Sequence, residues 1–219
     1  MTTINGYEIT TYADLSGADL SGQDLSGLDL YGANLSGANL SNTTCVGCDF
    51  QFANLDGANL TDGNFSESNF REANLQHATI NDTNFRECNF READLDGVTI
   101  QTSDLTSASF MKANLHGARF LLNTFSGTGF NQADMSSAIL ENQDFRGAFL
   151  TGVVFFGANL RGINLRDAIL SNCDFSQADL TDADLTNANL LTSIIKYTIL
   201  NRANLTKTTF EESVDTSLY

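Results

Sequence analysis

The chain has 219 residues, with 27 acidic and 11 basic side chains for a formal net charge of −16, and it contains neither proline nor tryptophan. No apolar run approaches the roughly 18 residues of a membrane span, and the N-terminal segment lacks the basic and apolar blocks of a secretory signal. We therefore expect a cytoplasmic protein that neither enters a membrane nor binds nucleic acid directly.

Residues 1–12 precede any regular pattern and are expected to form an N-terminal cap. From Leu15 to Phe210 every fifth residue is apolar, at forty consecutive positions without a slip of register. The residue two before each of these central positions is small in thirty-five repeats, and Asp or Asn stands between the two in twenty-six. Residues two apart on an extended chain point the same way, so the small and the large residue face inward and the Asp or Asn faces water.

A period of five fits neither a helix nor a flat strand. Residues five apart drift around a helix, and on a strand they fall on alternating faces. The chain must therefore turn once per repeat, and Ser-Gly pairs such as 16–17 and 26–27 supply residues that permit turns. Phe50, Phe70, Phe90, Phe110 and Phe130 recur at a spacing of twenty, which predicts four repeats, hence four sides, in each coil.

This repeat resembles that of the pentapeptide-repeat family over nearly the whole chain, at residues 13–210. The resemblance implies an all-β fold, a right-handed quadrilateral β-helix, here with about ten uninterrupted coils. At the strand spacing of about 4.8 Å the stack would be roughly 48 Å long. The repeat alone does not specify a function.

The C-terminal coils carry apolar residues at outward positions where the N-terminal half has none. They precede a tail, 211–219, that is short for an independently stable helix. We expect these residues to form a dimer contact between two copies of the chain, and the alternative is that the tail folds back over them. The predicted dimer or cap surface comprises Leu191, Ile194, Tyr197, Ile199 and Leu218.

The cysteines and histidines give little support to catalysis or cofactor binding. Cys45, Cys48, Cys88 and Cys173 all occupy inward positions, so we expect buried, reduced thiols, although Cys45 and Cys48 form a lone CxxC that could suggest a metal or redox site. The two histidines fall on turns of different sides, without a nucleophile beside them. We expect no enzyme activity, no catalytic residues, no metal site and no cofactor.

Five inward residues are large for the small position. We expect local widening of the coil, with the amides bonded to neighbours or to backbone, and a ligand pocket is the alternative. These residues are Gln23, Leu28, Asn123, Gln143 and Ile163.

Acidic charge is concentrated at the N-terminal end. Residues 1–70 hold nine acids and no Lys or Arg. Residues 11–70 would span three coils, so their eight acids give about one charge per 1.8 Å, against about one per 1.7 Å of duplex DNA. The predicted partner-binding acids are Asp14, Asp19, Asp24, Asp29, Asp49, Asp56, Asp62 and Glu67.

The resemblance implies a role for this acidic block. Within the family, the Qnr quinolone-resistance proteins and MfpA are rods that resemble duplex DNA and bind DNA gyrase or topoisomerase IV. The resemblance thus implies an acidic interaction protein, a DNA mimic that modulates a type II topoisomerase or protects it from quinolones. The present register leaves no room for the loops that Qnr proteins project. The alternatives are a scaffold or regulator of another partner, with acids that serve only solubility.

Overall fold

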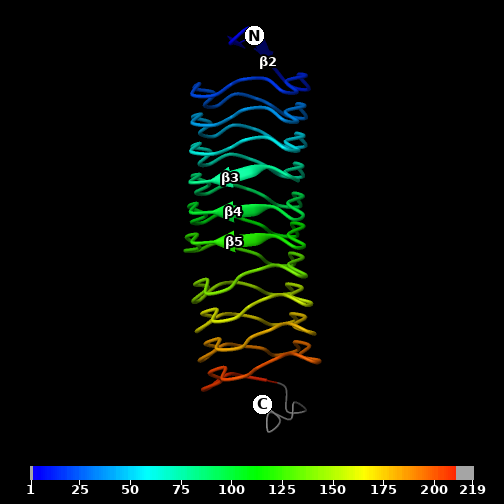
Figure 1. Cartoon of the computed structure of the whole chain (residues 1–219), viewed down its shortest axis with the longest axis vertical. Helices are drawn as coiled ribbons and strands as arrows, with labels where there is room; N and C mark the ends of the chain where they lie inside the picture. Colours follow the sequence, from blue (N-terminus) through cyan, green and yellow to red (C-terminus); the bar gives the residue numbers. More distant parts are fainter. Residues whose placement is uncertain (1, 211–219) are drawn as a thin grey trace.

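The computed structural model describes residues 2–210, which form one elongated stack of similar coils (Figure 1). At its N-terminal end, β1 (Thr2–Ile4) and β2 (Tyr7–Ile9) pair as an antiparallel hairpin in which Thr2 lies opposite Ile9. Ile9 is buried against the first coil, so the hairpin covers the open end of the core.

The coils are held together by parallel pairing between residues twenty apart. Isolated bridges such as Asp14 to Asn34 and Asp19 to Asn39 repeat along all four sides. On one side the pairing lengthens into three short strands, β3 (Thr79–Asn81), β4 (Thr99–Gln101) and β5 (Arg119–Leu121), in the order β3-β4-β5. This spacing confirms four repeats per coil.

The inward central residues build a continuous core. Those between Leu15 and Leu190 are buried, and the small residues two before them fill the space beside them. The phenylalanine column is confirmed: the ring centroids from Phe50 to Phe130 are 4.7, 4.9, 4.7 and 5.1 Å apart, and adjacent rings are within 10° of parallel. Each of the three middle rings stacks on one ring from the coil before and one from the coil after, which is the stacking that the spacing of twenty predicts.

Two backbone features build the turn between sides. The second turn residue has a left-handed conformation, as at Gly17 (φ 65°), and in many repeats a residue other than glycine adopts it, as Asp62 does (φ 58°). The outward Asp or Asn accepts a hydrogen bond from the backbone N–H two residues later: Ser16 N–H donates to Asp14 Oδ1 at 3.2 Å, and Ser36 N–H to Asn34 Oδ1 at 3.2 Å. The acid or amide therefore shapes the turn as well as facing water.

On one side the ladder between two coils is interrupted. Thr124 pairs with Asp104 but forms no bridge to Asp144, and the hydrogen bond from Phe125 N–H to the Asp144 carbonyl that the register predicts is not formed within the described residues. A depression of about 360 Å³ opens there. It is lined by Asn123, Thr124, Phe125, Ser126, Asp144 and Arg146.

Two of the large inward amides lie at this interruption. Asn123 Nδ2 donates to the Ile100 carbonyl at 2.8 Å, its Oδ1 accepts from Ser103 N–H at 2.9 Å, and Gln143 Nε2 donates to the Glu141 carbonyl at 3.1 Å. Gln23 Nε2 likewise donates to a backbone carbonyl, that of Ser21, at 3.4 Å. The expectation that these amides bond to backbone is confirmed. Of the two large apolar residues in the small position, Ile163 is buried and Leu28 is half-buried against the core.

Candidate interaction surfaces

The first coil presents one exposed aspartate on each side. Asp14, Asp19, Asp24 and Asp29 each pair with a different residue of the second coil, namely Asn34, Asn39, Thr44 and Asp49. Hydrogen bonds from Ser16, Ser21 and Ser26 lower the pKa of Asp14, Asp19 and Asp24 respectively, so these carboxylates are ionised at neutral pH.

The other four predicted acids lie on the second and third coils. Asp62 and Glu67 are exposed at turns, in the left-handed conformation, whereas Asp49 and Asp56 are half-buried. Asp56 lies 2.8 Å from His77 Nδ1. All eight acids therefore reach the surface, but the fold distributes them over all four sides of the rod and does not bring them together in a single patch.

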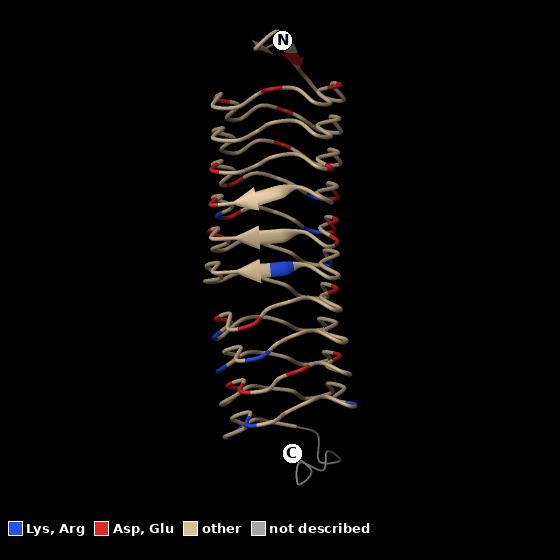
Figure 2. Cartoon of the chain, in the orientation of Figure 1, with Lys and Arg blue, Asp and Glu red and all other residues tan. Residues whose placement is uncertain are grey.

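Arg and Lys occur only beyond the first three coils, and arginine pairs with seven acids of the later coils (Figure 2). Within residues 11–70, no described acid has a Lys or Arg partner, and only Asp56 has a histidine beside it. Beyond residue 70, seven arginines form ion pairs with acids. The pairs include Arg71–Glu72 at 2.8 Å, Arg146–Asp144 at 2.7 Å and Arg202–Asp182 at 2.6 Å. The N-terminal end is therefore the stretch in which no acid has a Lys or Arg partner, whereas about half of the described acids beyond residue 70 have one.

Three of these ion pairs join residues at a spacing that a search for repeats of five does not test. Arg86 pairs with Asp104, Arg161 with Asp179 and Arg166 with Asp184, each eighteen residues apart. A turn arginine thus reaches the outward Asp that precedes the same corner one coil later. Partners eighteen residues apart are the signal that could have identified them. These pairs are partly exposed and contribute little to stability.

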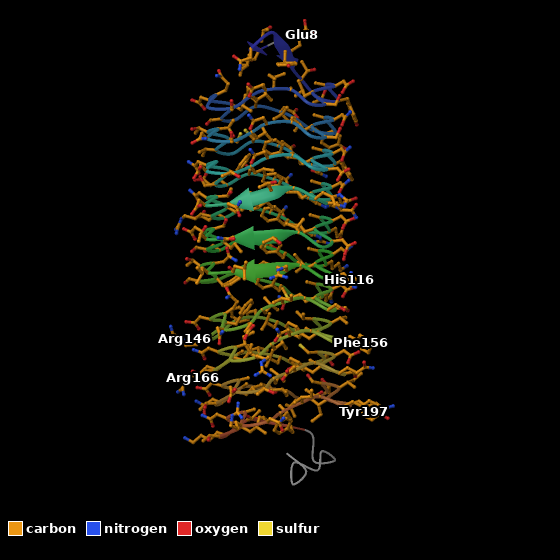
Figure 3. The ribbon with its side chains drawn as sticks, viewed as in Figure 1. Glu8, His116, Arg146, Phe156, Arg166 and Tyr197 are labelled. Atoms are coloured by element: carbon orange, nitrogen blue, oxygen red, sulfur yellow. The ribbon has the colours of Figure 1, made fainter. Side chains whose placement is uncertain are left out.

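The predicted apolar surface near the C-terminal end is exposed in the described residues. Leu191, Ile194, Tyr197 and Ile199 are 40%, 53%, 74% and 45% exposed. Leu218 lies outside the described residues. Phe156 and Tyr197 project from one long edge of the stack, whereas Arg146 and Arg166 project from the opposite edge (Figure 3). Lys196 shares the edge of Tyr197, with its Nζ 5.1 Å from the centroid of the tyrosine ring.

The cysteines are confirmed as free and buried. Burial raises the pKa of the Cys88 and Cys173 thiols to about 12, so neither is a thiolate at neutral pH. Within residues 2–210 no group of three or more His, Cys, Asp or Glu could hold a metal ion, and no helix could serve as an apolar membrane span.

Sequence reasoning missed an aromatic edge on the first three coils. Tyr12, Tyr31 and Phe52 stand at the same corner, and Tyr12 and Phe52 are 71% and 42% exposed. Tyr31 lies 19 and 21 residues from its two neighbours, so a search at the coil period of twenty finds only Tyr12 and Phe52, with Gly32 at the position between them. Sequence reasoning also missed Leu122, which is 78% exposed at a turn, because apolar residues at turns do not recur at a fixed spacing.

The four-sided stack with its apolar core defines a β-solenoid repeat protein whose candidate sites are surfaces. Eight copies of the pentapeptide-repeat family model match the chain. They cover residues 11–42, 33–71, 48–87, 68–106, 88–120, 103–142, 133–172 and 173–212. The chain therefore belongs to the pentapeptide-repeat family, as the sequence pattern indicated.

Solved structures of other pentapeptide-repeat proteins resemble this one. Full-length QnrB1, a plasmid-mediated fluoroquinolone resistance protein, is 18% identical with a TM-score of 0.56, over 89% of this chain and 94% of that chain. HetL from the cyanobacterium Nostoc, involved in the regulation of heterocyst differentiation, is 25% identical over 90% and 94% of the two chains, with a TM-score of 0.30. At these identities the QnrB1 likeness shows a shared fold. No curated protein sequence was found to match the chain.

Proposed function

We propose that this protein is a non-enzymatic, cytoplasmic interaction protein whose acidic coils mimic the charge of duplex DNA and bind a type II topoisomerase, DNA gyrase or topoisomerase IV. Binding would modulate the enzyme or protect it from quinolones. The observation that carries the proposal is the block of carboxylates at residues 11–70, none of which has a Lys or Arg partner, whereas seven acids of the later coils pair with arginine. The shared fold with a fluoroquinolone resistance protein supports the choice of partner.

The physical basis is electrostatic complementarity. An enzyme that binds DNA presents a cationic groove, and a rod with ionised carboxylates on every side offers that groove a matching charge at any rotation about its axis. Binding of this kind weakens as salt rises, because the interactions of exposed charges are screened. The proposed contact residues are the eight acids from Asp14 to Glu67 described above.

A DNA supercoiling assay with gyrase tests the proposal. The protein is titrated with and without a quinolone at two salt concentrations, and we expect inhibition or rescue at micromolar concentrations that is stronger at low salt. Absence of any effect at low salt and high protein concentration would remove the topoisomerase from the proposal.

The matched variants replace aspartate by asparagine, which keeps the turn. Asn34 and Asp14 accept the same backbone hydrogen bond at the same 3.2 Å, so the quadruple variant Asp14→Asn, Asp19→Asn, Asp24→Asn and Asp29→Asn should fold normally and lose most of the effect. The control makes the same change of charge at four arginine-paired aspartates and should retain the effect. These are Asp104, Asp144, Asp179 and Asp184.

A second candidate function is a scaffold or regulator that binds another protein through its apolar C-terminal coils, with acids that serve only solubility. The exposed Ile194, Tyr197 and Ile199 favour it. Binding through them would be insensitive to salt, which distinguishes it from the first function. We also propose that this surface, with Leu191 and Leu218, joins two copies of the chain in a homodimer.

The same proposal includes the finer features of the fold that the family resemblance implies: a right hand, about ten coils, and a division into a cap (1–12), a β-helix (13–210) and a tail (211–219). A crystal structure would test each of them.

A further inference from the structure

The aromatic edge of the first three coils is built on the surface and not in the core. The rings of Tyr12 and Tyr31 have centroids 5.5 Å apart at 79°, and those of Tyr31 and Phe52 are 5.3 Å apart at 73°. Both are edge-to-face contacts, which hold each ring in a defined orientation. Three aromatic rings are therefore ordered side by side along one corner while Tyr12 and Phe52 stay accessible.

Gly32 makes room for this arrangement. It occupies the corner position of the second coil, between Tyr12 on the first and Phe52 on the third. A Cβ atom added there would lie 2.6 Å from two carbon atoms of the Tyr12 ring. The glycine thus lets the Tyr12 ring lie over the next turn. Other turns of the first two coils carry Ser-Gly pairs, as at 16–17, 26–27 and 36–37, so the turn itself does not require aromatic residues.

Carboxylates surround the same corner. The turns that carry Tyr31 and Gln51 begin at Asp29 and Asp49, whose Oδ1 atoms accept the backbone N–H groups of Tyr31 and Gln51 at 3.0 Å in each case. Desolvation, followed by the nearby Tyr12, Asp49 and Glu72, raises the pKa of the Tyr31 phenol. The edge therefore combines accessible aromatic faces with negative charge.

Among the described residues no Lys or Arg is in cation–ring contact with the three aromatic residues, although Arg71 follows at the same corner on the next coil. Among the described residues, neither Asp29 nor Asp49 forms an ion pair, and the cation–ring contact that is present joins Lys196 to Tyr197 at the far end of the rod. Glu72 is occupied by Arg71 at 2.8 Å. The first three coils thus leave the exposed rings and two carboxylates without ion pairs available to a protein partner.

We propose that the Tyr12–Tyr31–Phe52 edge, with Asp29 and Asp49, is a docking site for an arginine side chain on the surface of a protein partner. A guanidinium is planar, stacks on an aromatic face and pairs with a carboxylate through its fork of donors, whereas a lysine ammonium is a strongly hydrated point charge. The site thus prefers arginine to lysine, which acidic charge alone does not. This inference rests on the proposal that the acidic coils bind a cationic partner, but not on the partner being a topoisomerase.

The test uses two synthetic peptides of equal charge, hexa-arginine and hexa-lysine, in calorimetric titrations of the full chain at the same salt concentration. The wild-type protein should bind hexa-arginine about fivefold more tightly, from one or two exposed cation–π contacts. The variant Tyr12→Ala with Phe52→Ala should lose this preference and keep its affinity for hexa-lysine. Equal affinities in the wild-type protein, or a preference that survives in the double variant, would overturn the proposal.

Two further variants control for loss of bulk and for general effects on the fold. Tyr12→Leu with Phe52→Leu keeps apolar volume without a π face and should also lose the preference. Leu122→Ala removes an even more exposed side chain from a distant corner and should leave both affinities unchanged. If gyrase does not respond but the preference for arginine is intact, only the topoisomerase is excluded. If gyrase responds without any such preference, only the aromatic edge is excluded.

Discussion

At the residue scale, the repeat depends on one left-handed residue per turn. Glycine adopts this conformation freely, whereas other residues incur strain that the ladder around them must offset. Gly17 has a φ of 65°, and no atom lies within 4 Å of a Cβ placed on it, so a substitution there isolates the cost of the backbone conformation from steric clash.

Gly17→Val should therefore lower the free energy of unfolding by about 1–2 kcal/mol, because a branched side chain is strained at positive φ. Gly17→Asn should cost clearly less, since asparagine tolerates this conformation and occupies it at residue 42. Urea unfolding followed by circular dichroism measures both. Equal losses for valine and asparagine would show that left-handed strain is not the cause.

At the element scale, the stability of each coil depends on its contacts with the coil before it and the coil after it. Between Thr124 and Asp144 the backbone pairing of two neighbouring coils is missing on one side. The core beneath it is intact, because the rings of Phe125 and Phe145 remain stacked with centroids 4.5 Å apart. Backbone groups beside the depression are therefore the place where the ladder should open first.

Hydrogen exchange followed by NMR can test this. The amides of Phe125 and Asp144 should exchange at least about tenfold faster than those of Phe85 and Asp104 on the same side, which donate to backbone carbonyls at 2.8 and 3.0 Å. The ring of Phe125 is as buried as a core residue, so the difference would come from the missing hydrogen bonds. Similar protection at all four amides would mean that the ladder is continuous in solution.

At the scale of the whole molecule, periodicity decides what the sequence can predict. The inward positions, the four-sided coil and the phenylalanine column follow from it, because one register must satisfy every coil at once. Turn residues are free of this constraint, so the aromatic edge and the arginine pairs eighteen apart could not be found by counting fives. The large side chains of Asn123 and Gln143 in the small inward position did indicate an irregular coil. Side-chain size alone does not show, however, that two neighbouring coils lack backbone hydrogen bonds there.

The proposed homodimer is also a property of the whole rod, because the end of a solenoid exposes a sheet edge and core that a second copy can cover. Ile194→Asp with Ile199→Asp places two charges on the exposed apolar surface and should convert a dimer into a soluble monomer of 23.7 kDa, measured by light scattering after size exclusion.

The control is Leu122→Asp, which puts a charge on an exposed apolar side chain far from the C-terminal coils and should leave the mass unchanged. A wild-type mass of one chain, or a double variant that keeps twice the chain mass, would refute the contact. In the first case the exposed isoleucines would be available to a different protein. The scaffold function would then gain support, because an apolar surface of this kind is costly to leave in water.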